Sequence, residues 1–573
     1  MGLLWVLGIV ALLPAAAAAG AAAPPPPPAQ EHWRQRFHAL PATPFSQDIT
    51  APFFDPVTRR WHVGVDCSGG YAPRGGLSWC HLSSTDLLHW REHPVTLYPT
   101  SNATLDPCVP TVVDTGSISV MPHTGHAFAI YATANATSTR TVYDGNVCLA
   151  VSTDPAHEEW TRLGPIINNP TCAHCSAACP HCTAPGVPCN ATPGPPGCET
   201  PIKDMIPRFG FRDPTTPYLA PCGGAAPNAD ADADACWFVV IGSGTTQGRE
   251  AAGLLYRSQS STDIMSPWTF VDVLIQEGAG RPYEQYQYSC PDFFQMPGAN
   301  SSNASNTWVW MSLFPAFQAG DSSHADIYYV GSLANNKFVA SAATPLTVDD
   351  NRKHHHFGHT IAKSAGGEGR RLLWGAVCGL PGAGIPNPPS AMPGATLTHR
   401  GCSVSLPQEL SMSSGGELEF RFIPELARLR NTSFLQDGSP VGAALDGGLQ
   451  LEIQAEFAAA APSSSVIGLA LFGGAVRVAY NGSSGDLFFD GNATQPIGPA
   501  SLMPRYVATT LRLTPGEALR LHVYVDGSVV EVIANDRSPL QVIVVPPADA
   551  DLRFAAVGQP LSHVAVHTLG ATA

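Results

Sequence analysis

The strongest constraint on the fold is a long series of short, strand-like segments between about Phe37 and Val377. Each segment is rich in β-branched and aromatic residues and is bounded by Gly, Pro, Asn or Asp, as strands joined by turns are. Helical periodicity is nearly absent. So many antiparallel strands would make one open sheet too wide and a single barrel too small. The pattern therefore predicts an all-β fold in which small sheets repeat around an axis, as in a β-propeller.

Three segments of this region, "SSTDLLHW", "STDPAHEEW" and "SSTDIMSPW", pair a Ser/Thr-Asp turn with a following Trp at irregular distances, as a propeller with loop insertions would. From about Leu410 the strands become longer and alternate apolar with polar residues, as in "LRLHVYVDGSVVEVIAND", which predicts a β-sandwich. We place the boundary near Pro407, with a catalytic-type propeller over residues 32–407 and a sandwich over 408–573. The Gly/Pro-rich stretch before it is expected to be a surface excursion or linker.

The first 23 residues form an apolar run without acidic residues that ends in small residues, as secretory signal peptides do. Five prolines follow, so residues 24–31 are expected to be a stiff spacer. A membrane anchor would need a longer span, uninterrupted by Pro14. We expect a secreted protein, extracellular or in the cell wall, or in a vacuole or other secretory lumen, with no membrane association after signal removal.

Two further features agree with export. The chain has 15 cysteines, many for a reducing compartment, and their odd number leaves at least one thiol unpaired, with Cys290 a candidate. Sequons for N-glycosylation occur at Asn102, Asn135, Asn190, Asn300, Asn303, Asn431, Asn481 and Asn492. The net charge of -15, with only 30 Lys and Arg, argues against nucleic acid or an anionic membrane as partner. A neutral partner fits better, and the oligomeric state is left open.

A cysteine-rich insertion spans residues 171–198 and contains two CxxC pairs with His174 and His181 nearby. This donor set could bind zinc. In an exported chain, six cysteines flanked by Pro, Gly and a sequon are better explained as a disulfide-stapled loop. The tract "RKHHHFGH" could likewise be a metal patch or a solvated loop, and the latter is the default. We expect no cofactor and no metal.

An ordered series of motifs carries a resemblance to a known family. Asp48 precedes a short apolar strand, and "WHVGV" begins thirteen residues later, at Trp61. Then come "LSWCHLSSTDLLHW", "DTGSISV", "FRDP", "YSCPDFF" and "YVDGSVVEVIAND". Over nearly the whole mature chain outside the insertion, the series resembles glycoside hydrolase family 32, which includes invertases, β-fructofuranosidases and fructan hydrolases. The resemblance implies a five-bladed β-propeller followed by a C-terminal β-sandwich.

The residues of the family's pocket are only partly kept. Gln47 and Ile49 flank Asp48 where the family has Asn and Pro, and Cys80 replaces a Gly. Asp66 stands where the family has Gln, and Asp114 stands near its Trp. The resemblance implies that the sugar contacts Asp66, Trp79, Asp114, Gly116, Ser117 and Arg212.

Cleavage of a fructofuranosyl bond with retention requires a carboxylate nucleophile and a carboxylic acid, typically about 5 Å apart. The resemblance assigns the nucleophile to Asp48 and gives Asp213 the task of stabilising the oxocarbenium-like transition state. It also implies that Arg212 fixes the carboxylates electrostatically. From the residues alone, Asp48 could be a turn or cap residue, Asp213 part of an Asp-Pro turn, and Trp79 a core aromatic.

The family's acid/base falls on Ser289, whose hydroxyl cannot act as a general acid at any working pH. General acid catalysis typically supplies about 10² to 10⁴ in rate. Glu284 is a speculative replacement, although on an extended strand it would point away from Ser289 unless a bulge re-aims it. Asp292 has the same parity problem and matches a carboxylate that the family already carries.

Three functions follow as hypotheses. The first is a retaining glycosidase that cleaves β-fructofuranosyl bonds in sucrose or fructans, impaired by Ser289. The second is a carbohydrate-binding pseudoenzyme that has lost hydrolysis. The third, which has less support, is a hydrolase of arabinose-type furanosides.

Overall fold

The computed structural model describes most of the chain outside its N-terminus and several loops. The described residues are 35–39, 45–67, 77–108, 110, 112–134, 146–168, 211–223, 235–244, 251–277, 288–296, 307–315, 324–342, 346–350, 363–378, 402–458, 466–491, 506–544 and 551–572. The expected signal peptide, the Pro-rich spacer, the cysteine-rich insertion, the "RKHHHFGH" tract and Glu284 lie outside these ranges. Within them, no helix is long and apolar enough to cross a membrane.

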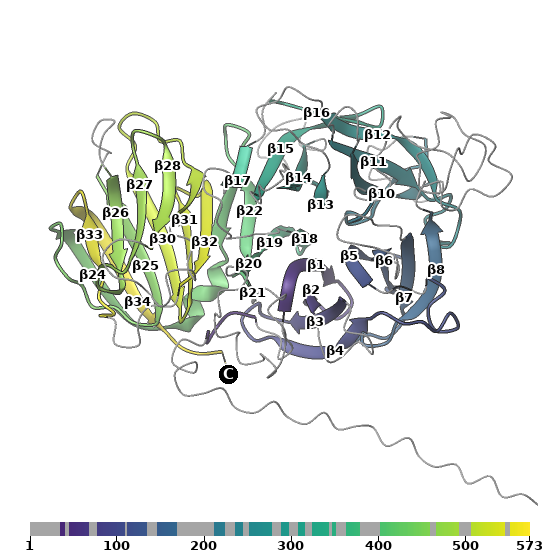
Figure 1. The fold of residues 1–573 in the computed structure, drawn as a ribbon, viewed down its shortest axis with the longest axis horizontal. Helices are drawn as coiled ribbons and strands as arrows, with labels where there is room; N and C mark the ends of the chain where they lie inside the picture. The colour runs from purple at the N-terminus through teal and green to yellow at the C-terminus, as the bar shows by residue number, and fades with distance from the viewer. Residues whose placement is uncertain are drawn as a thin grey trace, which may run out of the picture.

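Five sheets surround a common axis and form the five-bladed β-propeller (Figure 1). Blade 1 contains β1 (Phe45–Asp55), β2 (Arg60–Cys67), β3 (Ser78–Ser84) and β4 (Arg91–Leu97), in that order. Blade 2 contains β5 (Val112–Val120), β6 (Ala127–Ala134), β7 (Val147–Ser152) and β8 (Thr161–Ile167). Blade 3 contains β9 (Tyr218–Pro221), β10 (Ala235–Gly244), β11 (Ala251–Arg257) and β12 (Thr269–Glu277).

Blade 4 contains β13 (Ser289–Gln295), β14 (Trp308–Pro315), β15 (His324–Ala334) and β16 (Lys337–Ala340), and β17 (Leu346–Asp350) also pairs with β15. Blade 5 contains β18 (Lys363–Gly367), β19 (Arg370–Trp374), β22 (Gln408–Met412) and β23 (Leu418–Phe422). A two-stranded sheet of β20 (Ala376–Cys378) and β21 (Cys402–Val404) lies beside it. β1 contacts β5 and β18, and β13 contacts β10 and β18, so the inner strands complete the ring.

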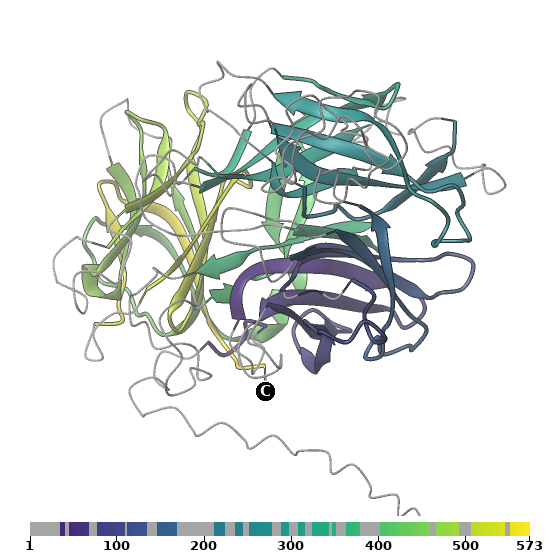
Figure 2. The ribbon, with the colours of Figure 1, turned by 45° about the vertical axis from the view of Figure 1, so that its right-hand side comes forward.

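The sandwich follows a short 3-10 turn (Pro424–Leu429) and consists of two antiparallel sheets (Figure 2). One sheet contains, in spatial order, β24 (Arg430–Ser439), β34 (Leu561–Leu569), β25 (Gln450–Phe457), β30 (Leu519–Asp526), β31 (Val529–Ala534) and β32 (Ser538–Ile543). The other contains β29 (Tyr506–Thr510), β28 (Asp486–Asp490), β27 (Val476–Asn481), β26 (Val466–Leu471) and β33 (Ala555–Val557). Alternating apolar residues of both sheets form one buried core, as the sequence pattern predicts.

The strand pairing places the end of the propeller beyond Pro407. β22 pairs with β19, and β22 and β23 pair with each other, so both complete blade 5. The sequence pattern favours the sandwich for residues 408–422, but strands of both domains alternate in the same way. The strand with which β22 pairs decides its domain, and the local pattern does not specify that partner.

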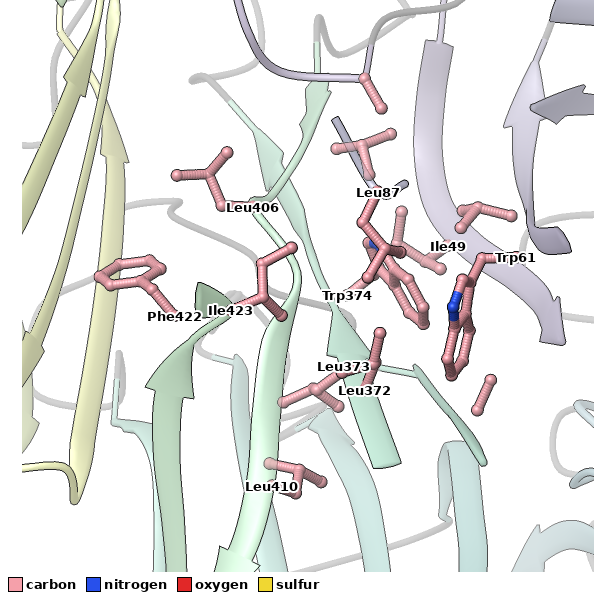
Figure 3. Packing of buried hydrophobic residues seen from close by; sticks show 14 of the residues in the cluster. Ile49, Trp61, Leu87, Leu372, Leu373, Trp374, Leu406, Leu410, Phe422 and Ile423 are labelled. Carbon is pink, nitrogen blue, oxygen red and sulfur yellow. The ribbon is translucent and has the colours of Figure 1, made fainter. Parts of the chain in front are cut away.

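A hydrophobic cluster joins blade 1, blade 5 and the sandwich (Figure 3). Trp61 of β2 packs against Trp374 of β19 with ring centroids 5.9 Å apart, and Leu406 and Ile423 extend the cluster toward the sandwich. Tyr524 of β30 belongs to the same cluster. The two domains therefore share buried apolar surface, which holds them in one arrangement.

Two acidic residues of the segment "YVDGSVVEVIAND" bind the N-terminal segment to the sandwich. The Asp526 carboxylate accepts hydrogen bonds from the backbone N–H groups of Arg36, Phe37 and His38. The His38 ring bonds through Nδ1 to Asp526 Oδ2 at 2.7 Å and through Nε2 to Glu531 Oε1 at 2.8 Å. Glu531 Oε1 also accepts from the backbone N–H of Leu406, so these two acids link three parts of the chain.

Three disulfides occur among the described cysteines: Cys67–Cys80, Cys108–Cys148 and Cys222–Cys236. Cys290, the candidate for an unpaired thiol, is free and buried.

Candidate active site

Asp48 lies in an irregular part of β1, where the pairing with β2 shifts register between Phe45 and Ile49. A bulge of this kind re-aims a side chain. The Asp48 side chain is buried, and its Oδ2 lies 3.2 Å from Thr115 Oγ1 of β5 and 3.7 Å from the Cys290 thiol of β13. Strands of three different blades therefore meet at this carboxylate.

Arg212 and Asp213 lie just before β9 and are held by the neighbouring strand. Arg212 and Gly242 of β10 exchange two backbone hydrogen bonds. A Cβ at Gly242 would lie 2.5 Å from the Tyr288 carbonyl oxygen, so only glycine allows this approach. Asp213 adopts φ +56°, an uncommon conformation for a residue with a side chain. Such conformations cluster at functional sites, where the surrounding structure holds them.

Ser289, at the first position of β13, links these two residues. Arg212 Nη2 donates to Ser289 Oγ at 3.0 Å, and this hydroxyl lies 3.2 Å from Asp213 Oδ2. The backbone N–H of Cys290 donates to the same Asp213 oxygen at 2.8 Å. Cys290 has φ +47° and lies where β13 shifts register against β14. This bulge turns Ser289 and the Cys290 thiol toward Asp213 and Asp48.

Trp79 and Gly116 support the wall behind Asp48. Trp79 is buried, and its Nε1 donates to the backbone oxygen of Asp114 at 3.1 Å. A Cβ on Gly116 would lie 2.8 Å from the Trp79 ring and 2.4 Å from the Ile130 carbonyl oxygen. Because both residues are enclosed by protein atoms, the geometry gives them a positioning role, whereas we expected direct contact with sugar.

Two further contacts tie the site to neighbouring blades. The Ser117 hydroxyl, also predicted to bind sugar, donates to the backbone oxygen of Pro214 at 2.6 Å and so holds the Arg-Asp-Pro segment against β5. Asp292 Oδ2 accepts from the backbone N–H and the hydroxyl of Ser364 in blade 5. Buried Lys363 donates to the backbone oxygen of Pro291 at 2.6 Å. Asp292 is therefore engaged with blade 5.

The site has a strong excess of negative charge. Burial, together with the charges of Asp114 and Asp213, raises the pKa of Asp48 to about 7, although Arg212 and the Thr115 hydroxyl oppose this shift. Burial raises the pKa of Asp66 well above its usual range, and the charge of Asp48 adds to the effect. Thr115 Oγ1 lies 3.4 Å from Asp66 Oδ2, so one hydroxyl lies beside both carboxyl groups. Perturbed carboxylates in one place are typical of catalytic sites.

The structure thus brings together Asp48, Asp66, Asp114, Arg212, Asp213 and Ser289, while Glu284 lies outside the described residues. Sequence reasoning missed Thr115 and Asp326. Asp326 of β15 is buried, and burial and the charge of Asp48 raise its pKa well above the usual range. Thr115 lies within the motif "DTGSISV" and could have been found there, whereas Asp326 lies outside every motif of the series. In the part of the chain that the structure describes, the set of side chains with metal-ligand spacing is Asp55, His62 and His157, which lie outside this site.

A five-bladed propeller with a C-terminal sandwich, carrying a buried Asp48 beside an Arg212–Asp213 pair, defines a glycosidase of the β-fructofuranosidase type. The chain matches the glycosyl hydrolases family 32 N-terminal domain over residues 38–178 and 226–418, and the family 32 C-terminal domain over residues 425–568. It belongs to glycoside hydrolase family 32.

Individual relatives are distant. Sucrose-6-phosphate hydrolase of Escherichia coli is 25% identical over 87% of this chain and 86% of its own length. Fructan 1-exohydrolase of Bromus pictus is 25% identical over 61% of this chain, a match that spans 48% of the relative. Among solved structures, fructan 1-exohydrolase IIa from Cichorium intybus superposes with a TM-score of 0.66 at 16% identity, covering 94% of this chain and 98% of that one. Exo-inulinase from Aspergillus awamori gives 0.65 at 16% identity, covering 94% and 99%. These superpositions confirm the fold.

Proposed function

We propose that this protein binds β-fructofuranosyl units of sucrose or fructans and transfers them to water through a fructosyl-Asp48 intermediate. The observation that carries the proposal is the contact of Ser289 with Arg212 and Asp213, together with Asp48 at the thiol of the adjacent Cys290. In this mechanism Asp48 attacks the anomeric carbon, and Asp213 and Arg212 stabilise charge in the transition state. The names of the relatives, which include sucrose and fructan hydrolases, support this substrate class.

Ser289 limits this mechanism at the departure of the leaving group. Its hydroxyl lies between Arg212 and Asp213 and has no proton acidic enough to give to a sugar oxygen. The fructosyl bond of sucrose must therefore break with little or no protonation. We infer that turnover is slow when the leaving group is a sugar and faster when the leaving group is stable as an anion.

Comparison of two leaving groups tests this function. We would assay 4-nitrophenyl β-D-fructofuranoside beside sucrose and inulin, with Asp48→Asn as control. We expect kcat/KM on the aryl substrate, which reports departure of the leaving group, to exceed that on sucrose by about 10² to 10⁴, the usual worth of a general acid. Asp48→Asn should abolish both activities. Equal kcat/KM values on the two substrates would refute the absence of an acid, whereas equal kcat values alone would show that hydrolysis of the shared intermediate is rate-limiting.

A carbohydrate-binding pseudoenzyme is the second candidate, because Ser289 occupies the acid/base position. The same assay distinguishes the two. Binding of sucrose by calorimetry without release of nitrophenol from the aryl substrate would establish the binding protein. An arabinofuranoside with the same aryl group, included in the assay, tests the third candidate.

One buried carboxyl group of the pocket offers an alternative to bond cleavage without protonation. Burial and the charge of Asp48 raise the pKa of Asp66 well above its usual range, which favours its protonated form, and Thr115 Oγ1 lies beside both carboxyl groups. If Asp66 donates the proton, Asp66→Asn should lower kcat on sucrose and leave the aryl substrate unaffected. Equal losses on both substrates would instead mean that Asp66 binds the fructosyl ring.

We also propose that the protein is exported and glycosylated. The three disulfides of the described residues support an oxidising compartment. Asn102 and Asn431, two of the sequons, are exposed, as a glycosylated Asn must be. Expression of the full chain in a eukaryotic host tests this: recovery from the medium with a glycosidase-sensitive mass supports export, and retention in the cytosol would contradict it.

A further inference from the structure

A second buried cluster of titratable side chains lies at the end of β1 farthest from Asp48. Asp55 is the last residue of β1, seven positions and therefore roughly 20 Å along the strand from Asp48. His62 lies on β2, and His157 lies in the turn between β7 and β8 of blade 2. All three are buried, and one potential ligand atom from each lies within 4.8 Å of the others. The cluster therefore spans the junction of two blades.

The histidines have ring nitrogens that no described residue satisfies. His62 Nδ1 bonds to His81 Nε2 at 2.7 Å, while His62 Nε2 is buried without a hydrogen-bond partner among the described residues. His157 Nε2 lies 3.3 Å from Asp55 Oδ2, and its Nδ1 is likewise unsatisfied there. Buried polar atoms without partners are costly, so each such atom calls for a water or an ion. His62 Nε2 is therefore the orphan atom that points to a ligand, because the atom of His157 that faces Asp55 is Nε2 and not Nδ1.

The protonation state suits a metal. Burial, together with the charges of His157, His93 and Arg60, lowers the pKa of His62 to about 2. Burial also lowers the pKa of His157, against the opposing charge of Asp55. Both imidazoles are therefore neutral at physiological pH, the form that binds metal ions. When His62 Nδ1 donates to His81, the lone pair of Nε2 remains available.

Outer contacts hold the three side chains as second-shell partners hold metal ligands. Asp55 Oδ1 accepts from the Val57 backbone N–H at 2.8 Å, and Thr58 Oγ1 donates to Asp55 Oδ2 at 2.5 Å. The Phe53 ring stacks on His62 at 4.5 Å between centroids. His157 has φ +53°, and its backbone oxygen accepts from Trp160 Nε1. These contacts leave the ligand atoms little freedom to turn away.

A line of aromatic and polar groups continues outward from His62. His81 stacks on His93 with centroids 4.3 Å apart. His93 bonds through Nε2 to Ser83 Oγ at 2.7 Å and through Nδ1 to Glu158 Oε1 at 2.8 Å. Glu158 follows His157 directly in sequence, so this line and the cluster connect the same two blades.

We propose that Asp55, His62 and His157 bind one divalent transition-metal ion of the zinc type, which cross-links blade 1 to blade 2. Two imidazole nitrogens and one carboxylate oxygen form a donor set that zinc accepts, with a fourth position for water. Zinc ligands lie about 2.0 to 2.2 Å from the ion, so the three side chains close slightly when it enters. Coordination through His157 Nε2 requires the neutral tautomer that carries the ring proton on Nδ1, so the hydrogen bond from Nε2 to Asp55 is exchanged for the bond to the ion. The role is structural, because the cluster is remote from Asp48.

Cobalt provides a spectroscopic test in the full-length, oxidised protein after removal of metal. Co²⁺ at a four-coordinate nitrogen and oxygen site absorbs visible light, whereas thiolates of the cysteine-rich segment would add near-ultraviolet charge-transfer bands. We would compare wild type with Asp55→Asn and His157→Gln, which keep the hydrogen-bonding capacity of each side chain. The control is His89→Gln, because the His89 side chain is 59% exposed and pairs with Asp86.

We expect wild type and His89→Gln each to bind one more Co²⁺ than Asp55→Asn and His157→Gln. The visible absorption band of Co²⁺ should appear only in wild type and His89→Gln. Zn²⁺ should raise the thermal midpoint of wild type by several degrees and that of the cluster variants less. Equal stoichiometry, spectrum and thermal response in all four proteins would overturn the proposal and leave a hydrogen-bonded network that holds water. Should the variants fail to fold, wild-type crystals soaked in zinc decide: an anomalous peak among the three side chains supports the site, and its absence refutes it.

Discussion

Arg212 Nη2 lies 3.0 Å from Ser289 Oγ, the hydroxyl that occupies the family's acid/base position. This hydroxyl also lies 3.2 Å from Asp213 Oδ2. Ser289 therefore connects the guanidinium and the carboxylate of the Arg-Asp-Pro motif. In the proposed function these three side chains keep the contacts of a sugar-binding site although Ser289 supplies no acidic proton.

Ser289→Glu should restore a general acid. We expect kcat on sucrose to rise by about 10² to 10⁴, with little change on the aryl fructoside, whose leaving group needs no proton. Steady-state kinetics on both substrates check this. Ser289→Gln is the matched control, since it has the same size and no acidic proton. An equal rise in both variants would show that side-chain size, and not proton donation, limits the wild type.

Activity should depend on the ionisation of Asp48. Burial and the charges of Asp114 and Asp213 raise the pKa of this carboxyl group to about 7. A nucleophile must be ionised, so kcat/KM on the aryl substrate should rise with pH around a midpoint near 7. Asp114→Asn removes one of the causes and should move the midpoint to lower pH. A midpoint near pH 4 in the wild type would contradict the raised pKa.

Ionisation of Asp48 should lower the stability of the fold, although it raises the activity. The folded-state pKa of Asp48 is raised above the unfolded value of 3.8, so the folded protein holds this proton more tightly. The stabilisation is fully present below about pH 4 and is lost as pH rises through 7. Asp48→Asn should therefore raise the thermal midpoint more at pH 8 than at pH 5. A pH-independent difference would show that Asp48 titrates alike in both states.

His38 should stabilise the contact of the N-terminal segment with the sandwich. Burial alone would lower its pKa, but hydrogen bonds to Asp526 and Glu531, with their charges, raise it to about 9. The pKa is raised above the unfolded value of 6.5, so this stabilisation is fully present below pH 6.5 and is lost as pH rises through 9. His38→Gln should cost about 3 kcal/mol at pH 6, because it leaves buried carboxylates without their cation.

Thermal unfolding of His38→Gln and wild type at pH 6 and pH 10 measures this difference. At pH 6 we expect the variant to unfold at a lower temperature than wild type. At pH 10 we expect the difference between the two thermal midpoints to be smaller. His89→Gln serves as control, since its partner Asp86 lies near the surface. An equal gap at both pH values would show that His38 contributes by packing alone.

The Cys67–Cys80 disulfide should support both stability and the site. It closes a separation of 13 residues, worth roughly 3 kcal/mol, and it adjoins Asp66 on β2. Cys222–Cys236 closes a similar separation of 14 residues in blade 3 and is the matched control. Replacement of either pair by serine should lower the thermal midpoint by a similar amount. Only the Cys67/Cys80 variant should change KM for the fructoside. An unchanged KM would show that this disulfide does not affect substrate binding.

Much of the fold is readable from short-range patterns. Alternation with a period of two predicts strands wherever one face is buried, and Gly, Pro, Asn and Asp mark the turns between them. The ordered motifs place Asp48, Arg212, Asp213 and Ser289 in one family and hence in one site. The domain boundary near Pro407 was misplaced because blade strands and sandwich strands share the same alternation. Only the pairing of β22 with β19 distinguishes them.

The site was predictable as a set of residues and not as a geometry. The motif that contains Trp79 does not indicate that its ring is enclosed behind Asp114. No sequence pattern around Asp326 indicates that it lies close to Asp48. His62 and His157 lie on different blades and have no common spacing.

The sequence by itself determined the strand content and the family, because these reside in local patterns and ordered motifs. The tertiary structure alone decided which side chains meet. Bulges at Asp48 and Cys290 re-aim side chains, and closure of the ring brings distant strands together. Burial then shifts the pKa values of carboxylates and imidazoles, because loss of water raises the free energy of their charged forms.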